Sequence, residues 1–234
     1  MVLKDIFLTG GSGTLGTELI KKSDDFNIRF VAPPTSACDI TILEEVMENI
    51  RNFKGKVVLH AAAMTNVRQI EGDSMASIEV NVCGTINIIK ACQELNKKLV
   101  FISTDYVFDG EKGNYKTNDP INPISKYAKT KAAAELLVRI IDNSLVIRTS
   151  FFGYNFPYDK AATDQWSTKD YVDIIAPMVL KETISNKTGI IHVGTDRSST
   201  FEKAVRRKIN VERVSLNDIK FKIPRDISLF LGDQ

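Results

Sequence analysis

Short apolar runs alternate with longer stretches of helical periodicity through the first 150 residues. In the stretch 42–53, for example, apolar residues recur at Ile42, Val46 and Ile50, the spacing of one helix face. Strands separated by helices of this length form a parallel sheet that helices cover on both faces. The predicted strands are 4–9, 27–32, 56–60, 99–103 and 145–147, and the predicted helices are 14–22, 42–53, 73–95 and 125–141.

The pattern becomes irregular after Arg148. We expect a sheet domain over residues 1–150 and a small lobe over residues 151–234 that lies at the carboxyl edge of the sheet and is not an independent domain. Within this lobe the predicted elements are a helix at 170–184, a strand at 189–194 and a short basic helix at 200–208.

Composition excludes several classes of protein. The chain has 31 Lys and Arg against 29 Asp and Glu, so it lacks the basic excess of a nucleic-acid binder. Its apolar stretches are too short to span a membrane, and residues 1–5 lack the apolar core of a secretory signal. The three cysteines and two histidines show no metal-ligand spacing, so we expect no metal site and reduced thiols in a cytoplasmic protein.

A glycine cluster lies between the first predicted strand and the first predicted helix. Gly10, Gly13 and Gly16 have the spacing G-x-x-G-x-x-G. Glycine allows a tight turn and a close approach of the backbone to a pyrophosphate, and the helix N-terminus offers N–H groups to the phosphates. The sequence therefore predicts a dinucleotide-binding loop in a Rossmann-type, doubly wound sheet.

The end of the second predicted strand leaves the choice between NAD and NADP open. NAD-selective sheets often place an acid there to bind the ribose 2′-hydroxyl. Here the position reads Val31-Ala32-Pro33-Pro34, the next acid is Asp39, and no arginine follows that could bind a 2′-phosphate.

Tyr127 and Lys131 are four residues apart at the start of a predicted helix and so share one face. Ser103 and Thr104 end the fourth predicted strand, at the edge where ligands of such sheets bind. A nearby ammonium lowers the pKa of a tyrosine, which can then give or take a proton near neutral pH. A threonine hydroxyl can hold the substrate oxygen beside it.

With these motifs the chain resembles an extended short-chain dehydrogenase/reductase and, within that superfamily, is similar to the dTDP-4-dehydrorhamnose reductase family. The resemblance runs from about residue 4 to about residue 230, although residues 151–194 and the tail are shorter than the family norm. The matching stretches are Thr9–Gly16, 60–63 (HAAA), 81–85 (NVCGT), 103–110 (STDYVFDG), 123–131, 148–153 (RTSFFG), Asp164-Gln165, Tyr171-Val172-Asp173 and Ile223-Pro224-Arg225-Asp226.

The resemblance implies a role for individual residues. Tyr127 is the expected proton donor, Lys131 binds the nicotinamide ribose, and Thr104 binds the carbonyl oxygen. The substrate is expected to contact Thr104, Asp105, Phe151, which replaces the family's usual tryptophan, and Arg225. The residues expected to contact the cofactor are Gly10, Ser12, Gly13, Thr14, Leu15, Asp39, Ile40, Ala61, Ala62, Ala63, Tyr127 and Lys131.

The implied activity is reduction of a nucleotide-linked 4-keto-6-deoxysugar with NADPH or NADH, as in rhamnose biosynthesis. The resemblance also suggests a homodimer that pairs through the helices at 73–95 and 125–141. The sequence does not distinguish a thymidine from a uridine nucleotide, nor does it identify the sugar.

Two alternatives stay open. One is a nucleotide-sugar epimerase or dehydratase, although the dehydratases have Asp-Glu after the threonine and here Tyr106 follows Asp105. The other is a non-catalytic subunit like the regulatory subunit of methionine adenosyltransferase, which retains much of this motif set.

At single positions, His60 is expected to be structural and Asn81 to be either a structural residue or part of a water relay. The basic residues at 203–208 are expected to form a solvated helix end.

Overall fold

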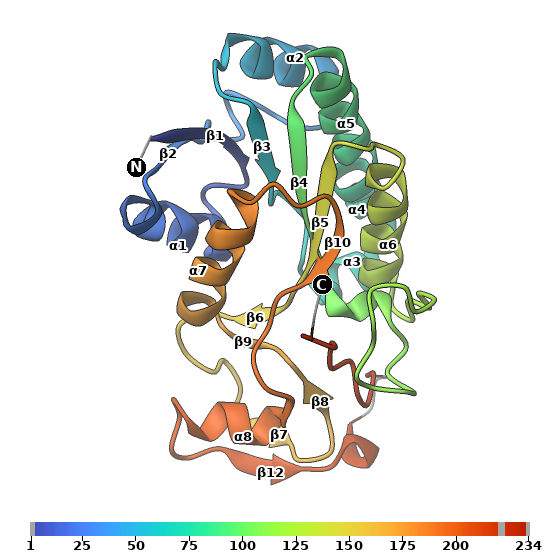
Figure 1. The fold of residues 1–234 in the computed structure, drawn as a ribbon. Helices are drawn as coiled ribbons and strands as arrows, with labels where there is room; N and C mark the ends of the chain where they lie inside the picture. Colours follow the sequence, from blue (N-terminus) through green and yellow to red (C-terminus); the bar gives the residue numbers. More distant parts are fainter. Residues whose placement is uncertain (1–2, 220–222, 233–234) are drawn as a thin grey trace.

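A six-stranded parallel sheet forms the centre of the computed structural model, which describes residues 3–219 and 223–232 (Figure 1). The strand order is β10-β5-β4-β3-β1-β2, so β2 lies on one side of β1 and the later strands follow one another on its other side. The order in which strands are added therefore reverses between β1 and β3. Ligands of such sheets bind outside the carboxyl ends of the strands at this reversal. The strands are β1 (Lys4–Thr9), β2 (Ile28–Val31), β3 (Val57–His60), β4 (Lys98–Ser103), β5 (Ser144–Arg148) and β10 (Gly189–His192).

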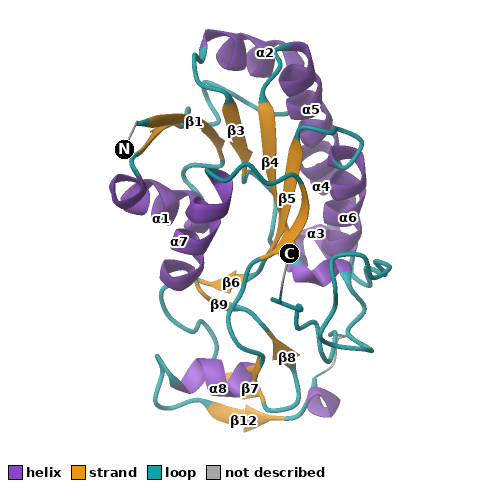
Figure 2. Ribbon diagram, viewed as in Figure 1, coloured by secondary structure: helices purple, strands orange, loops and turns teal. Residues whose placement is uncertain are grey.

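Helices cover both faces of this sheet, as predicted (Figure 2). One face carries α1 (Thr14–Lys22) and α7 (Val172–Thr183), and the other carries α2 (Leu43–Asn52), α5 (Gly84–Glu94) and α6 (Lys126–Val138). The predicted helix at 73–95 is divided into α4 (Ser74–Ile78), the π-helical turn η2 (Glu79–Cys83) and α5, and α3 (Val67–Gly72) precedes it. The doubly wound fold class is therefore confirmed.

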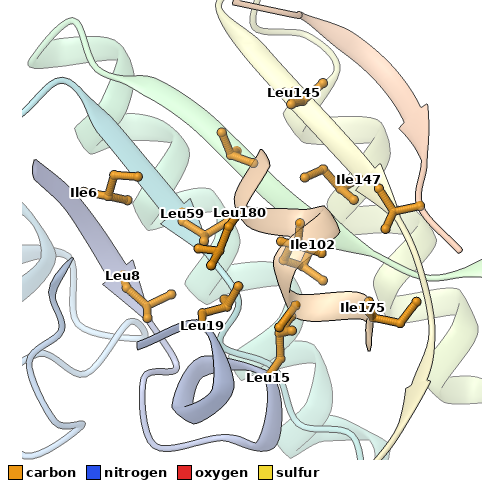
Figure 3. Packing of buried hydrophobic residues seen from close by; sticks show 14 of the residues in the cluster. Ile6, Leu8, Leu15, Leu19, Leu59, Ile102, Leu145, Ile147, Ile175 and Leu180 are labelled. Atoms are coloured by element: carbon orange, nitrogen blue, oxygen red, sulfur yellow. The ribbon is translucent and has the colours of Figure 1, made fainter. Parts of the chain in front are cut away.

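Alternate residues of the strands fill two separate cores. Ile6 and Leu8 of β1 point toward α1 and α7, where Figure 3 shows them with Leu19 and Leu180. Phe7, between them, packs on the opposite face. All five are at most 1% exposed, and burial of each such side chain stabilises the fold by roughly 1.5–3 kcal/mol.

The second part of the chain contributes to the sheet as well as to the lobe. Helix α7 packs against α1, and β10 pairs with β5 at the edge of the central sheet. The lobe below the sheet consists of short strand pairs and one short helix: β6 (Phe151–Phe152) with β9 (Asp170–Tyr171), β7 (Lys160–Ala162) with β12 (Glu212–Val214), β8 (Trp166–Ser167) with β11 (Ser198–Ser199), and α8 (Thr200–Val205).

Three 3₁₀ turns complete the described structure: η1 (Ser23–Phe26), η3 (Asp105–Val107) and η4 (Leu216–Asp218). Within residues 3–219 and 223–232, no helix combines the length and the apolar content of a membrane span. The same ranges contain no cluster of three or more His, Cys, Asp or Glu side chains suited to a metal ion.

The expected solvated basic end of α8 is wrong for Lys203. Its side chain is 2% exposed, and its ammonium lies 3.4 Å from Asp170 and donates a 2.6 Å hydrogen bond to Thr195. Arg206 also donates to Asp170, at 2.9 Å. Asp170 is 1% exposed, and a buried carboxylate is costly unless cations such as these pair with it. The sequence around 203–208 does not show this pairing, because Asp170 is distant from it along the chain.

Candidate active site

The loop between β1 and α1 is built around glycines. Gly10 has a φ of +75°, and a Cβ there would lie 2.6 Å from the backbone nitrogen of Ala62. A Cβ at Gly16 would collide with the carbonyl oxygen of Gly10. These two positions need glycine because backbone segments from β1, α1 and the end of β3 meet there.

Gly13 differs from these two glycines. It is the N-cap of α1, and a Cβ there would meet only the Gly10 carbonyl oxygen, at 3.3 Å. No side chain caps this helix end and its first turn contains no acid, so the helix N-terminus fits an anion such as a pyrophosphate. Of the predicted cofactor contacts here, Ser12 and Thr14 are exposed, whereas the Leu15 side chain belongs to the core.

A chain of buried hydrogen bonds joins the ends of β1 and β3. The His60 ring lies between the hydroxyls of Thr9, 2.7 Å from Nδ1, and Thr85, 3.0 Å from Nε2. Burial, with Lys131 nearby, lowers the pKa of His60 to about 3, so the ring is neutral. Because the Thr85 hydroxyl donates to the Asn81 carbonyl, Nε2–H donates to Thr85 and Nδ1 accepts from Thr9. The structure gives His60 the structural role expected.

Residues 61–63 follow directly and are partly exposed. The Ala62 N–H donates to the Thr9 hydroxyl at 3.3 Å, which fixes this segment beside Gly10. Asn81 holds the next residue, Met64, by accepting from its N–H at 2.7 Å and donating to its carbonyl at 3.0 Å. Asn81 also donates to the Thr130 hydroxyl on α6 at 3.0 Å. These protein partners favour the structural alternative for Asn81.

Asp39 and Ile40 lie in the segment between β2 and α2. The Asp39 carboxylate accepts from the N–H and the hydroxyl of Thr41 at 2.9 and 2.8 Å, so it shapes a turn. The Ile40 side chain is 7% exposed and packs in the core. Their contact with an adenine remains a prediction.

Thr104 and Tyr127 come together at the carboxyl edge. Thr104 follows β4, is 3% exposed, and lies close enough to Tyr127 to affect its pKa. The expected lowering of the Tyr127 pKa by Lys131 is wrong here, since burial and the Asp105 carboxylate raise that pKa more than the Thr104 hydroxyl lowers it. The phenol is therefore protonated at neutral pH.

Lys131 lies one turn after Tyr127 on α6 and is 4% exposed. Its ammonium lies 4.1 Å from the centre of the Phe101 ring and donates a 2.8 Å hydrogen bond to the Ile102 carbonyl. Burial lowers the pKa of Lys131 to about 7, although Glu135 opposes this shift. Small changes in its surroundings can therefore change its charge near neutral pH.

A buried ion pair holds the elements of the site together. Arg148, at the end of β5, lies 2.6 Å from Glu135 of α6, and the two side chains are 1% and 0% exposed. Glu135 also accepts a 2.6 Å hydrogen bond from Ser103 at the end of β4. Three elements that carry site residues are thus joined at one carboxylate.

Asp105 is fully buried beside Thr104. Its Oδ1 atom accepts hydrogen bonds from the hydroxyls of Ser150 and Thr104. Burial raises the pKa of Asp105, while Ser150, the Lys169 ammonium and Thr104 oppose this. The sequence motifs did not mark Ser150 or Lys169 as site residues. Ser150 stands directly before Phe151 in the RTSFFG stretch, but no local pattern marks Lys169.

The other two expected substrate contacts lie apart in the fold. Phe151 begins β6, directly after Ser150, and packs against the core on the α1 and α7 face. Arg225 is exposed and lines a pocket of about 290 Å³ with Asp109 and Leu216. Their contact with substrate remains a prediction.

Known proteins resemble this chain in both fold and sequence. The crystal structure of dTDP-4-dehydrorhamnose reductase from Bacillus anthracis, in complex with NADP, matches with a TM-score of 0.87 and 26% identity and covers 97% of this chain and 90% of that one. A hypothetical dTDP-4-dehydrorhamnose reductase from Sulfolobus tokodaii matches with a TM-score of 0.83 and 30% identity over 97% of this chain and 92% of that one.

Among curated proteins, the dTDP-4-dehydrorhamnose reductase of Aggregatibacter actinomycetemcomitans is 35% identical over 179 residues, which are 74% of this chain and 61% of that protein. The chain thus spans less than two thirds of the length of this relative. The predicted family resemblance is confirmed. Because the family model described as RmlD substrate binding domain matches residues 4–175, well over half of the sequence, the chain belongs to this family.

Proposed function

We propose that the protein reduces the keto group of a nucleotide-linked 4-keto-6-deoxysugar with NADPH or NADH. The observation that carries this proposal is the meeting of Thr104, Tyr127 and Lys131 at the carboxyl edge of the parallel sheet, the same edge at which the Gly10–Gly16 loop follows β1. The family and the reductase names of its relatives support the same reaction class.

The site fits a dinucleotide. The uncapped N-terminus of α1 would bind the pyrophosphate through Ser12, Gly13, Thr14 and the backbone of Leu15. The crystal structure of the Bacillus anthracis relative is in complex with NADP, which supports a dinucleotide as the ligand. The partly exposed residues 61–63 would line the adjoining trough, and Lys131 would bind the nicotinamide ribose. The bound cofactor supplies a hydride to the carbonyl carbon.

The chain's own residues handle the proton and the oxygen. Tyr127, protonated at neutral pH, is suited to donate its proton to the carbonyl oxygen as negative charge develops there. Thr104, which lies beside Tyr127, would donate to the same oxygen and hold it in line. The raised pKa keeps the proton on Tyr127 until the carbonyl oxygen gains negative charge, and it also makes the phenol a weaker acid than free tyrosine.

The test is oxidation of NADPH or NADH, followed by absorbance, with dTDP- and UDP-linked 4-keto-6-deoxy sugars. We expect turnover with at least one pair and loss of turnover in Tyr127→Phe. An epimerase would convert the sugar without net cofactor oxidation. A regulatory subunit would bind cofactor and turn over no sugar. Either result would exclude the proposed reductase function.

We also propose a homodimer that pairs through α4 and α6. Three large apolar side chains on these helices are exposed, namely Met75 (61%), Leu136 (50%) and Ile140 (76%), the last just beyond α6. Figure 1 places α4 and α6 along one side of the molecule. Exposed apolar groups of this kind mark protein interfaces when they gather. Light scattering is expected to give twice 26.1 kDa, and a particle of 26.1 kDa at all concentrations would exclude the dimer.

The proposed compartment is the cytoplasm. Cys38, Cys83 and Cys92 are free thiols, and burial raises the pKa of Cys38 to about 11 and that of Cys92 to about 12, which makes these two unreactive. Cell fractionation with an antibody against the chain would test this assignment.

A further inference from the structure

Asp105 has one carboxylate oxygen in use and one without a partner. Oδ1 accepts from Ser150 and Thr104, whereas Oδ2 is buried and has no hydrogen-bond partner among the residues that the structure describes. The side chain is 0% exposed. A buried acceptor of this kind is costly unless a ligand or water completes it, so it points to a group that binds here.

Lys169 faces the same space from the lobe. Strands β6 and β9 run parallel with Phe151 opposite Asp170 (Figure 1). The residues just before these two strands are Ser150, whose hydroxyl donates to Asp105, and Lys169, so both lie at the same end of the strand pair. The Lys169 ammonium lies 4.1 Å from the centre of the Phe152 ring, which holds the side chain in position.

Lys169 and Asp105 attract each other without touching. The electrostatic interaction raises the pKa of Lys169, against the lowering by burial, and lowers that of Asp105. Yet among the described residues no carboxylate oxygen lies within 4.0 Å of the Lys169 ammonium. A half-buried cation and a buried anion that are separated in this way leave room for a group that can pair with both.

We propose that Lys169 and Asp105 together bind the substrate hydroxyl next to the reacting carbonyl, which is the C3 hydroxyl of a 4-keto sugar. This inference rests on the proposed function and names a recognition pair for its substrate. A hydroxyl can donate to Asp105 Oδ2 and accept from the Lys169 ammonium at the same time. A keto group or a methyl group cannot do both.

The distance from the reacting oxygen fits a neighbouring hydroxyl. Thr104 donates a 3.2 Å hydrogen bond to Asp105 Oδ1 and lies beside Tyr127. An oxygen held by Thr104 and Tyr127 is thus one side chain away from Asp105. The pair therefore fits substrates that carry a hydroxyl beside the ketone, and a deoxy sugar would leave Asp105 Oδ2 and the Lys169 ammonium without that partner.

The test compares Lys169→Met with wild type on two substrates: the dTDP-linked 4-keto-6-deoxy sugar and its analogue without the C3 hydroxyl. Methionine keeps the apolar contact with Phe152 and removes the charge. We expect kcat/KM for the full substrate to fall about 10–100-fold, as for loss of a hydrogen bond to a charged group. For the deoxy analogue, the variant should equal wild type within about twofold.

Equal losses on both substrates, or no loss on either, would overturn the inference, because Lys169 would then only neutralise Asp105 or do nothing. Lys169→Arg should restore part of the discrimination. Lys181→Met is the matched control, since Lys181 is an exposed lysine on α7, and both of its substrate constants should equal those of wild type.

Calorimetric binding of the reduced sugar nucleotide and its 3-deoxy form, with oxidised cofactor present, separates this inference from the proposed function. If wild type turns over no sugar but binds the 3-hydroxy form at least tenfold more tightly, and Lys169→Met abolishes that difference, the recognition pair stands and the reductase activity fails. Equal binding of the two forms, or of neither, overturns the recognition pair.

Discussion

The Lys131 ammonium donates a 2.8 Å hydrogen bond to the carbonyl oxygen of Ile102, next to the last residue of β4. This contact joins α6 to the strand end that carries Thr104. It leaves Lys131 buried, so its pKa falls to about 7. The lysine on which cofactor binding is proposed to depend therefore changes charge within the physiological range of pH.

Substitution of Tyr127 by phenylalanine should separate binding from turnover. The variant lacks the proton but keeps the ring, so cofactor affinity should stay within about threefold of wild type. Turnover should fall about 10²–10⁴-fold, which is the usual effect of removing a positioned acid. Single-turnover NADPH oxidation with the 4-keto sugar nucleotide measures this. An unchanged rate would remove Tyr127 as the acid.

Cofactor binding should take up protons above neutral pH. In the free protein Lys131 loses its proton as the pH rises through about 7, below the ordinary value near 10.4. A ribose oxygen that accepts from the ammonium favours the charged form and raises this pKa on binding. Affinity should therefore weaken with rising pH from about 7 upward, by up to about tenfold per pH unit.

Calorimetry at pH 8 in buffers of different ionisation heat measures the proton uptake directly. In Lys131→Met the uptake and the slope of affinity against pH should both disappear. If wild type binds cofactor at pH 8 without proton uptake, Lys131 does not act as an ammonium in the complex.

Two glycines of the β1–α1 loop should differ in what their substitution damages. At Gly13 a new side chain meets only the Gly10 carbonyl, so Gly13→Val should cost about 1 kcal/mol or less in stability. It should still weaken cofactor binding strongly, because the side chain occupies the N-terminus of α1. At Gly16 a Cβ collides with backbone, so Gly16→Ala should cost about 1–3 kcal/mol. Urea unfolding measures the stability of both variants, and cofactor titration measures their binding. Binding of cofactor by Gly13→Val with the affinity of wild type would contradict the prediction.

Arg148→Met should destabilise the fold by about 3–5 kcal/mol, since it leaves the buried Glu135 carboxylate without its closest cation. Lys160→Met is the control, because it breaks an ion pair with Glu212 in which both side chains are over 60% exposed and should cost less than about 1 kcal/mol. The free energy of unfolding in urea measures both. A loss below 1 kcal/mol in Arg148→Met would mean that the Ser103 hydrogen bond and solvent are enough to stabilise the Glu135 carboxylate without Arg148.

The sequence predicted much of the fold because its signals are local. The short apolar run in 4–9 and the helical spacing in 42–53 each depend on neighbouring residues, so both elements lie within one residue of their predicted bounds. The break of the predicted helix at 73–95 was missed. Asn81 there bonds Met64 and Thr130, which are distant in the sequence, and the helix widens into a π-helical turn at that residue.

The site divides in the same way. The chain's sequence by itself determined the glycine loop, Tyr127 with Lys131, and Thr104 at a strand end, because spacing along one element fixes their relative positions. Only the tertiary structure decided the charge states and the lobe residues. Burial sets the pKa of Tyr127 and Lys131, and the pairing of β6 with β9 brings Lys169 to Asp105. Desolvation, and the approach of two residues that are 64 positions apart in the sequence, leave no mark in a local pattern.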